Sequence, residues 1–305
     1  MIEIFNTEEQ FIDLGDGIRL VYTNPEEFAK YYIAYYGHKY SDYYFKASPS
    51  ALLERANLLN AGYFILKNDR LVGGVLLKPN YMRDLFVVPP FKDYDFLCGK
   101  VLEYLISVSK KEEKLFIHEV VEEHVSTYIK RGFELQEEGF WMIRPTEAMI
   151  PFLPTEYKSK PIVEEDKNEL ADLIMAAYQA NPAVKIVDSK ERYIKHIEFF
   201  LEHSKDKEIL YNSSKAVYHK STGELAGMCL HMEFEALPLI MSFAVKPEHQ
   251  GKGIGSYLLR HSINYSRAAY PATRLYVLDK NSAIEIYEHF GFIRNRSLSD
   301  MIKSL

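Results

Sequence analysis

The chain has 305 residues, of which 47% are apolar and 26% are charged, and its net charge is −6. This composition is typical of a folded protein of about two domains, and it excludes disordered, collagen-like and low-complexity classes. The negative charge argues against a nucleic-acid partner, because non-specific binding to nucleic acid needs a basic surface.

Targeting and redox signals point to one compartment. No run of about 18 apolar residues occurs, so we expect no transmembrane helix and no membrane partner. The N-terminal residues are acidic and lack the basic segment of a secretory signal. The two cysteines, Cys98 and Cys229, are too few for a disulfide framework or a metal cluster. We therefore expect a cytoplasmic protein without a bound metal.

The first half contains a tyrosine-rich segment. Tyr31, Tyr32, Tyr35 and Tyr36 recur at helical spacing and predict a helix with one aromatic face. Further tyrosines follow at positions 40, 43 and 44. Such a face suits packing on the protein's own sheet, which we favour, or a pocket for a cationic amine.

Prolines mark the boundary between the two halves. Pro145, Pro151, Pro154 and Pro161 fall within a short stretch, and proline disfavours both helix interiors and sheet ladders. The pattern predicts a first domain over residues 1–148, a proline-rich linker over 149–160 and a second domain over 161–305.

The two halves resemble each other in sequence. Four segments of the first half have counterparts in the same order in the second: 71–76 and 225–230, 86–88 and 243–245, 115–117 and 275–277, and 128–133 and 287–292. Small loop insertions would account for the slightly unequal spacing. We interpret the pattern as a duplicated domain.

Hydrophobic periodicity and breaker residues predict alternating helices and strands in the second half. The expected helices are 165–178, 189–203, 253–269 and 282–290; the expected strands are 216–219, 225–233, 239–245 and 274–278, with one or two short strands after them. The predicted fold class is α/β (α+β), in which each half has a mixed, mostly antiparallel sheet flanked by helices.

The strongest chemical signal is the segment from Val245 to Ser256, where a strand leads through a glycine-rich turn into a helix. Glycines let successive backbone N–H groups converge on one anion. The helix N-terminus contributes about half a positive charge, and Lys252 adds a full one. The segment therefore predicts a diphosphate-binding loop.

Three ligands could use such a loop. A P-loop requires G-x-x-x-x-G-K-[ST], which the chain lacks. A dinucleotide-binding loop has a third glycine where this chain has Ser256, and the acidic Asp279 comes too late for the ribose contact. The third candidate is coenzyme A, which is held by a single loop.

Two motifs together resemble the GNAT superfamily of N-acetyltransferases. The run Gln250-Gly251-Lys252-Gly253-Ile254-Gly255 matches that family's Q/R-x-x-G-x-G/A motif, and Asn281-x-Ala283-x-x-x-Tyr287 resembles its second motif. The resemblance covers residues 160–305 well. The first half looks like a degenerate copy, so the whole chain resembles a tandem GNAT protein.

The resemblance implies a set of cofactor-binding residues. Phe243, Ala244 and Val245 would pair with the pantetheine arm of acyl-coenzyme A. Asn281 would lie near the pantetheine amides, although helix capping is an equally common role for asparagine. The remaining contacts would be the loop amides and the second motif: Gln250, Gly251, Lys252, Gly253, Ile254, Gly255, Ser256, Ala283 and Tyr287.

Tyr287 is the expected catalytic residue of the resemblance. Its hydroxyl would lie beside the thioester sulfur and stabilise the departing thiolate. Complete proton transfer from a phenol of pKa near 10 to a thiolate of pKa near 8.5 is uphill by about 2 kcal/mol in water. Hydrogen bonding is therefore the simpler role.

The acceptor amine must lose a proton before it attacks. Some family members carry a glutamate base at the start of the cofactor strand, where this chain has Leu239. Glu233 is the best substitute, and Glu235 and His231 are further candidates. Each of these also suits a purely structural place in a hairpin.

The first half lacks the loop glycines. Its counterpart segment contains Asp93 and Asp95, which would repel a diphosphate. We expect this half to bind no coenzyme A and its Tyr128 to be a packed core residue.

The favoured function is transfer of an acyl group, with acetyl expected, from acyl-CoA to a small-molecule or peptide amine by direct attack in a ternary complex. The alternatives are a non-catalytic acyl-CoA sensor or scaffold, and an acyltransferase for thiols or hydroxyls. We expect a monomer or homodimer.

Overall fold

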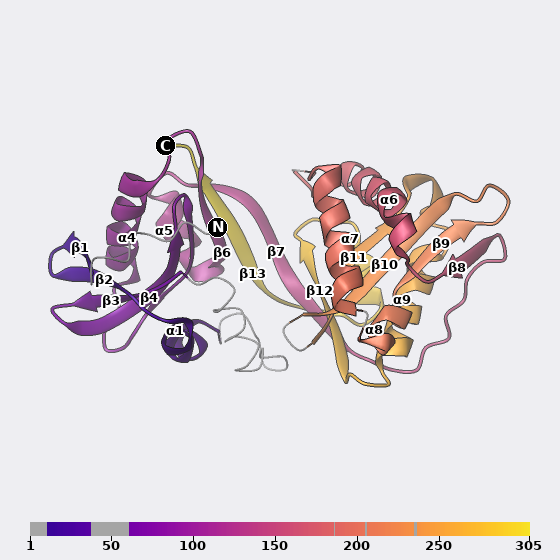
Figure 1. Cartoon of the computed structure of the whole chain (residues 1–305), viewed down its shortest axis with the longest axis horizontal. Coiled ribbons are helices and arrows are strands. Elements are labelled where there is room, and N and C mark those ends of the chain that lie inside the picture. Colours follow the sequence, from indigo (N-terminus) through magenta and orange to yellow (C-terminus); the bar gives the residue numbers. More distant parts are fainter. Residues whose placement is uncertain (1–10, 38–60, 186, 205, 235–236) are drawn as a thin grey trace. The chain divides into compact units, whose positions relative to one another are not determined.

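The computed structural model describes residues 11–37, 61–185, 187–204, 206–234 and 237–305 (Figure 1). The chain divides into two compact units. The first is built from Met1–Gly139 together with Asn295–Leu305, and the second is Phe140–Arg294. Among the described helices, none combines the length and the apolar character that a membrane crossing requires.

The first unit contains seven strands and three α-helices in its described part. The strands are β1 (Ile12–Gly15), β2 (Ile18–Tyr22), β3 (Gly62–Lys67), β4 (Arg70–Lys78), β5 (Tyr81–Val87), β6 (Leu115–Val121) and most of β13 (Ile293–Lys303). The helices are α1 (Pro25–Tyr32), α4 (Tyr94–Val108) and α5 (Glu122–Ile129). A short π-helical segment, Ile33–Gly37, follows α1.

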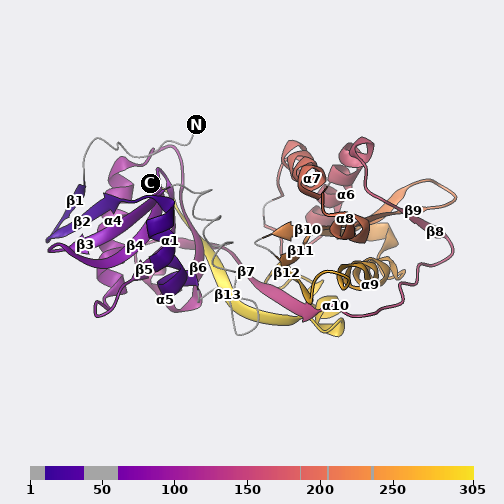
Figure 2. The same ribbon diagram turned by 60° about the horizontal axis from the view of Figure 1, so that its bottom comes forward.

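The sheet of the first unit has the order β1-β2-β3-β4-β5-β6-β13. All neighbours with a defined register are antiparallel except β5 and β6, which run parallel because α4 connects them. The helices α4 and α5 cover one face and α1 covers the other (Figure 2).

The tyrosine-rich helix packs on its own sheet. Tyr32 is buried, and Tyr31 meets the Phe64 ring edge-on at 5.0 Å. Tyr35 stacks on Phe86 of β5 at 6.3 Å. These contacts support the packing interpretation. The tyrosines at positions 40, 43 and 44 lie outside the described residues.

The second unit begins within β7 (Glu134–Pro145), whose first residues belong to the first unit. Its other strands are β8 (Tyr157–Lys160), β9 (Lys215–His219), β10 (Leu225–Phe234), β11 (Leu237–Val245) and β12 (Ala272–Leu278). Its helices are α6 (Lys167–Gln179), α7 (Lys190–Ser204), α8 (Glu208–Ser213), α9 (Ile254–Ser266) and α10 (Ile284–His289), with short 3₁₀ turns at Glu164–Asp166 and Pro247–His249.

The sheet of the second unit repeats the plan of the first, with the order β7-β12-β11-β10-β9-β8. Again one pair of neighbours, β11 and β12, runs parallel because a helix, α9, connects them. One core lies under α6 and α7, and a second core lies on the opposite face under α9 and α10 (Figure 2). The predicted mixed sheet with flanking helices is confirmed.

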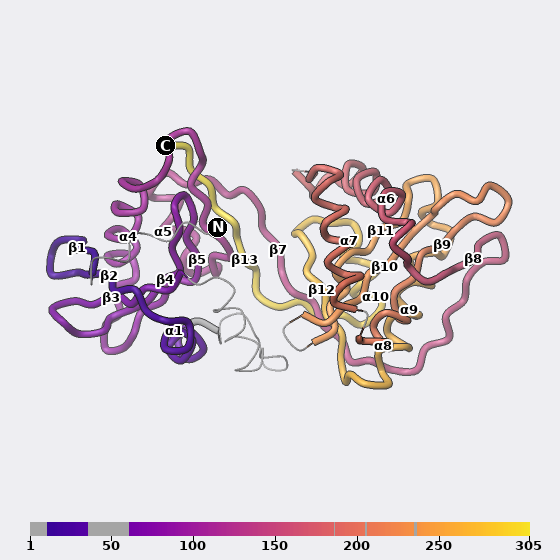
Figure 3. The backbone as a smooth tube through the Cα atoms, in the orientation of Figure 1, coloured from indigo at the N-terminus to yellow at the C-terminus, as the bar shows by residue number. Residues whose placement is uncertain are grey.

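Each unit takes a strand from the other half of the chain. β13 is the last strand of the sequence, yet it pairs with β6 of the first unit, with Leu298 opposite Val121 and Lys303 opposite Leu115. Figure 3 shows the yellow C-terminal end of the tube beside the purple strand β6. Fully buried Met301 belongs to the first core, and fully buried Met142 of β7 belongs to the second.

Several elements differ from the sequence prediction. Residues 157–160, within the predicted linker, form β8, and α8 was not expected. The chain end forms one strand of 11 residues instead of one or two short ones. Its apolar side chains are too sparse to alternate regularly, so its pairing depends on tertiary contacts with β6.

Candidate functional site

The site in the second unit begins where two parallel strands separate. In the described chain, β11 and β12 pair only at Leu239 with Arg274 and at Ile240 with Leu275. Residues 242–245 of β11 remain paired with β10 on their other side. The strand edge that faces β12 at Phe243 and Ala244 therefore has no strand partner, and an extended chain could bind there by strand addition.

The glycine-rich loop follows directly on β11. Gly251 has φ +71° and Gly253 has φ +80°, a left-handed conformation in which a side chain is strained. A Cβ added at Gly251 would have no neighbour within 4 Å, so the loop requires its backbone conformation and not its lack of bulk. The exposed Lys252 lies between these two glycines.

Three side-chain contacts fix the ends of this loop. Gln250 Nε2 donates a hydrogen bond to the carbonyl oxygen of Val245 over 3.2 Å. Lys246 forms an ion pair with Glu224 of the neighbouring hairpin. The buried His249 ring is hydrogen-bonded through Nδ1 to the Tyr157 hydroxyl, over 3.0 Å. These contacts hold the loop while its tip remains exposed.

The N-terminus of α9 carries unused hydrogen-bond donors. Gly253 is the N-cap, and no side chain caps the helix. The first intrahelical bond to the cap runs from the amide of Tyr257 to the carbonyl of Gly253. The amides of Ile254, Gly255 and Ser256 consequently have no backbone acceptor among the described residues, as expected for a first helical turn. Such donors, together with the helix dipole, fit an anion such as a diphosphate.

Tyr287 of α10 lies beside the separated strand edge. Its ring meets that of Phe243 at 5.9 Å and that of Phe292 at 5.9 Å, both edge-on. Burial raises the pKa of Tyr287 above its ordinary value, and Tyr178 and Cys229 raise it further. The hydroxyl therefore stays protonated and can act as a hydrogen-bond donor.

The first residues of the second motif lie at the N-terminus of α10. The Asn281 side-chain oxygen accepts a hydrogen bond from the amide of Ala283 at 2.8 Å. Ala283 is the N-cap residue and packs against the core under α9. Asn281 is therefore not the N-cap of α10, and its side chain instead forms a short turn just before the helix.

Tyr178 is a neighbour of the site that the sequence did not indicate. It lies in the last turn of α6, and burial raises its pKa to about 12. Its only sequence signal was its place at the end of a predicted helix. Burial also raises the pKa of Cys229 to about 12, and its Sγ lies 3.3 Å from Ser262 Oγ. Both groups are neutral at physiological pH, and neither is an activated nucleophile.

The structure does not bring Glu233 together with Tyr287. One Glu233 oxygen accepts from Lys207 Nζ at 2.8 Å and the other from the Tyr270 hydroxyl at 2.7 Å. Burial acts to raise the pKa of Glu233, but these two partners outweigh it and lower that pKa. Glu233 also lies four residues beyond Cys229 on β10, about 13 Å along the strand. It is placed to anchor Lys207 and Tyr270.

The other candidate bases are no better placed. His231 is fully buried, and its Nδ1 and Nε2 lie 2.9 Å from Ser213 Oγ and Thr273 Oγ1 respectively. Burial lowers the pKa of His231 to about 3, so it is neutral but enclosed. Glu235 lies outside the described residues.

In the first unit, the segment that corresponds to this loop is occupied by hydrogen bonds and ion pairs of the unit's own side chains. Asp93 caps α4 by accepting a hydrogen bond from the amide of Phe96 at 3.0 Å. Asp95 forms a two-pronged ion pair with Arg131, at 2.7 and 2.9 Å. The counterpart of Tyr287, Tyr128, is buried and its hydroxyl lies 2.9 Å from that of Tyr94.

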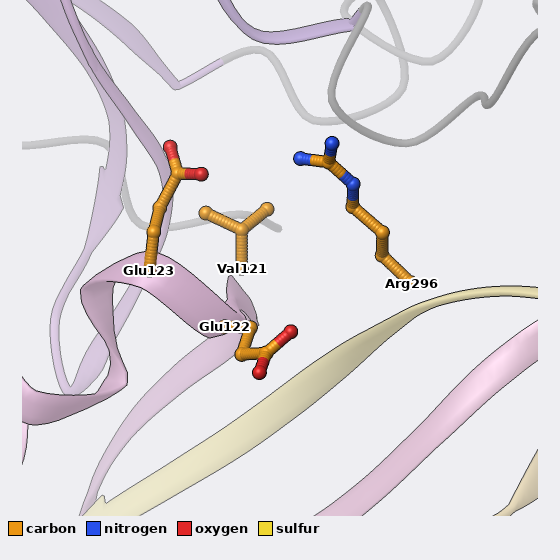
Figure 4. A pocket seen from close by; sticks show the side chains of 4 residues that line it. All are labelled: Val121, Glu122, Glu123 and Arg296. Carbon is orange, nitrogen blue, oxygen red and sulfur yellow. The ribbon is translucent and has the colours of Figure 1, made fainter.

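A hollow of about 360 Å³ lies in the first unit where β6 passes into α5. Val121, Glu122, Glu123 and Arg296 line it, and Figure 4 shows the Glu123 and Arg296 side chains extending into the same space. Two carboxylates at its wall disfavour an anionic diphosphate. The hollow therefore does not replace the missing loop of this unit.

Comparison with known proteins agrees with this geometry. Residues 169–292 match the model of the acetyltransferase (GNAT) family. A GCN5-related N-acetyltransferase from Sphaerobacter thermophilus is similar in structure, with a TM-score of 0.70 and 16% identity over 95% of this chain and 96% of that chain.

A tandem GNAT protein from the clavulanic acid biosynthesis pathway has a TM-score of 0.64 and 13% identity, over 94% of this chain and 98% of that one. No curated protein matches the chain in sequence. The chain thus carries a domain of the acetyltransferase (GNAT) family at residues 169–292 and has, over nearly its whole length, the fold of tandem GNAT proteins.

Proposed function

We propose that this protein transfers an acyl group, with acetyl the expected one, from acyl-CoA to the nitrogen of an amine in the second unit. The observation that supports it most is the uncapped N-terminus of α9, which follows two left-handed glycines. Its first-turn amides and Lys252 suit the diphosphate. The edge of β11 at Phe243, Ala244 and Val245 suits the amide-containing pantetheine arm.

Bound acyl-CoA would supply the activated acyl group. Tyr287 donates a hydrogen bond to the thioester sulfur as that sulfur gains negative charge. Because its pKa is raised, the hydroxyl remains a donor throughout the working pH range. Cys229 is buried and protonated, which favours direct attack by the amine over a covalent acyl-enzyme.

The described residues place no carboxylate that affects Tyr287 and could deprotonate the amine. In the described chain, the titratable groups that affect the Tyr287 hydroxyl are Tyr178 and Cys229, and neither is a base. Deprotonation of a lysine-like amine at pH 7 costs about 4.6 kcal/mol. We propose that the amine loses this proton to solvent before it attacks.

The test combines binding and turnover. Calorimetry should show coenzyme A binding to the full chain with one site, and mass spectrometry of an amine panel with acetyl-CoA should show an acylated product. Binding without product on any amine would favour the sensor function. Absence of coenzyme A binding would overturn both.

A further inference from the structure

A segment of the second unit lies along helix α9. The amide of Met149 donates a hydrogen bond to Asn264 Oδ1 near the end of the helix, at 3.2 Å. At the start of the helix, Pro154 Cγ lies 3.7 Å from the position of a Cβ on Gly253. Five extended residue steps and eleven helical steps both span about 16 Å. Residues 149–154 therefore run nearly extended and antiparallel to α9.

The side chains of this segment alternate in exposure, as an extended chain requires. Met149 and Leu153 pack against the core under α9. Ile150 and Phe152 are 86% and 72% exposed, more than any other large apolar side chain in the described chain. Two such neighbours on a surface are typical of a binding site.

Phe152 is the member of this pair nearest to the diphosphate loop. It precedes Pro154 by two residues, about 7 Å of extended chain, and Pro154 contacts Gly253. Ile150 lies farther along α9, toward Asn264. When a ligand's diphosphate binds at Gly251–Ser256, the groups attached to that diphosphate lie close to the loop. The Phe152 ring is exposed near the loop and can contact them.

Two cations flank the same surface. Lys252 is exposed at the tip of the loop. Arg260 follows Gly253 by seven residues and precedes Asn264 by four, so all three lie on one side of α9. Its guanidinium lies 5.4 Å from the centre of the Phe290 ring. A phosphate beside an aromatic base would find opposite charge here.

We infer that Phe152 stacks on the adenine ring of coenzyme A and that Arg260 binds its 3′-phosphate, while Lys252 remains the cation for the diphosphate. The inference rests on the proposed function, because it uses the same diphosphate loop. Stacking needs only the π face of the base, which an exposed phenylalanine can provide without a pocket. The proline-rich segment is thus part of the cofactor site and not only a connection.

Calorimetry with three ligands and matched variants tests this. Phe152→Ala should weaken the binding of coenzyme A and of 3′-dephospho-coenzyme A about tenfold, but leave that of 4′-phosphopantetheine, which lacks adenosine, unchanged. Ile150→Ala, which removes an even more exposed apolar side chain, should bind all three ligands like the wild type. Phe152→Trp should restore the affinity, and Arg260→Gln should reduce the preference for coenzyme A over its dephospho form.

Unchanged coenzyme A affinity in Phe152→Ala would overturn the inference. Equal effects of Phe152→Ala and Ile150→Ala on coenzyme A binding would also overturn it. So would a shift of both variants to a smaller species in gel filtration with unaltered coenzyme A affinity, because that result would indicate an interface between copies of the chain. The proposed function fails separately, if the wild type binds neither coenzyme A nor 4′-phosphopantetheine.

Discussion

Two tyrosines at corresponding positions of the two units have different surroundings. The Tyr128 hydroxyl has a partner in Tyr94, and its ring is packed edge-on against Phe133. Tyr287 also packs edge-on against a phenylalanine, Phe292, but its hydroxyl makes no hydrogen bond with another described residue and its ring borders the strand edge at Phe243. The pair therefore contrasts a structural role for Tyr128 with the catalytic role that we propose for Tyr287.

Replacing each of these tyrosines by phenylalanine tests that separation. Tyr287→Phe should lower kcat about 100-fold, since one hydrogen-bond donor to a developing charge is lost, while the Kd of coenzyme A stays within about twofold. Tyr128→Phe should leave kcat unchanged and cost about 1 kcal/mol of stability, because a buried hydrogen bond is lost. Steady-state kinetics, calorimetry and urea unfolding measure the three quantities. Equal kinetic loss in both variants would refute the assignment.

The pH dependence of the rate should follow the amine. The pKa of Tyr287 is raised above its ordinary value, that of His231 is lowered to about 3 and that of Cys229 is raised to about 12. None of them titrates between about pH 5 and 9. Only the neutral amine attacks, so kcat/KM should rise about tenfold per pH unit up to the amine's own pKa.

Two acceptors of different pKa provide the check on this profile. The inflection should move with the acceptor. A fixed inflection near neutral pH for both amines would reveal a base on the enzyme and contradict direct loss of the proton to solvent.

At the scale of elements, α9 and α4 occupy matching places but begin differently. α9 starts after left-handed Gly253 without a side-chain cap, whereas the Asp93 carboxylate occupies the first-turn amide of α4. A carboxylate at that position competes with any diphosphate for the same donors. The difference explains why we propose coenzyme A binding in the second unit alone.

Two exposed glycines give a matched test of the loop. Gly251 and Gly223 have φ values of +71° and +73°, and an added Cβ would meet nothing within 4 Å at either. Alanine should therefore cost each site a similar strain of about 1–2 kcal/mol. Only Gly251→Ala should also weaken the binding of coenzyme A, by about tenfold, because it redirects the loop amides. If calorimetry gave both variants the same affinity for coenzyme A, the assignment of this segment as a diphosphate-binding loop would be wrong.

At the scale of the molecule, the exchanged strands make each unit depend on the other half of the sequence. Met301 of β13 and Met142 of β7 are both fully buried, each in the core of the unit that the other half builds. Neither unit is complete as a continuous segment. A fragment that ends before residue 295 would lack a strand of its first sheet.

Alanine at these two methionines should reveal the exchange. Each change should cost about 2–4 kcal/mol, the usual loss for a buried methionine. Hydrogen exchange should then rise in β3–β6 for Met301→Ala, and in β9–β12 for Met142→Ala. If Met301→Ala increased exchange in the second unit instead, the assignment of β13 to the first unit would be wrong.

An ion pair also links the C-terminal strand to β6. His118 Nδ1 of β6 lies 2.9 Å from Asp300 Oδ1 of β13, and His118 Nε2 lies 3.8 Å from Glu119 Oε1. Burial alone would lower the pKa of His118, but Glu119 and Asp300 outweigh it and raise that pKa to about 9.

The pKa of His118 is higher in the folded state than its unfolded value of about 6.5. The ion pair therefore stabilises the folded protein fully below about pH 6.5. The benefit should be lost as pH rises through about 9. We expect a loss of about 2 kcal/mol, allowing for partial exposure of the imidazole. Denaturant unfolding of His118→Gln should show no such dependence in this window, and a wild-type profile equally flat would contradict the assignment.

Features that depend on short stretches of chain could be predicted from the amino-acid sequence alone. The loop from Gln250 to Ser256 follows from local backbone chemistry, since glycine φ and a helix start are encoded within a few residues. The alternation of strands and helices in the second half follows from hydrophobic periodicity. The helix of residues 190–204 and the strand of 225–234 begin and end within a residue or two of the predicted bounds.

Features that depend on residues distant in sequence became visible in the folded chain and not before. Glu233 looked accessible as a base, but Lys207 and Tyr270 come from other elements to bind it. The pairing of residues 298–303 with residues 115–121 could not be inferred from periodicity, because a strand's neighbour is selected by the shape and burial of the whole core. Phe152 gains its place beside the loop for the same reason, through contacts of its neighbours with a helix about a hundred residues later in the chain.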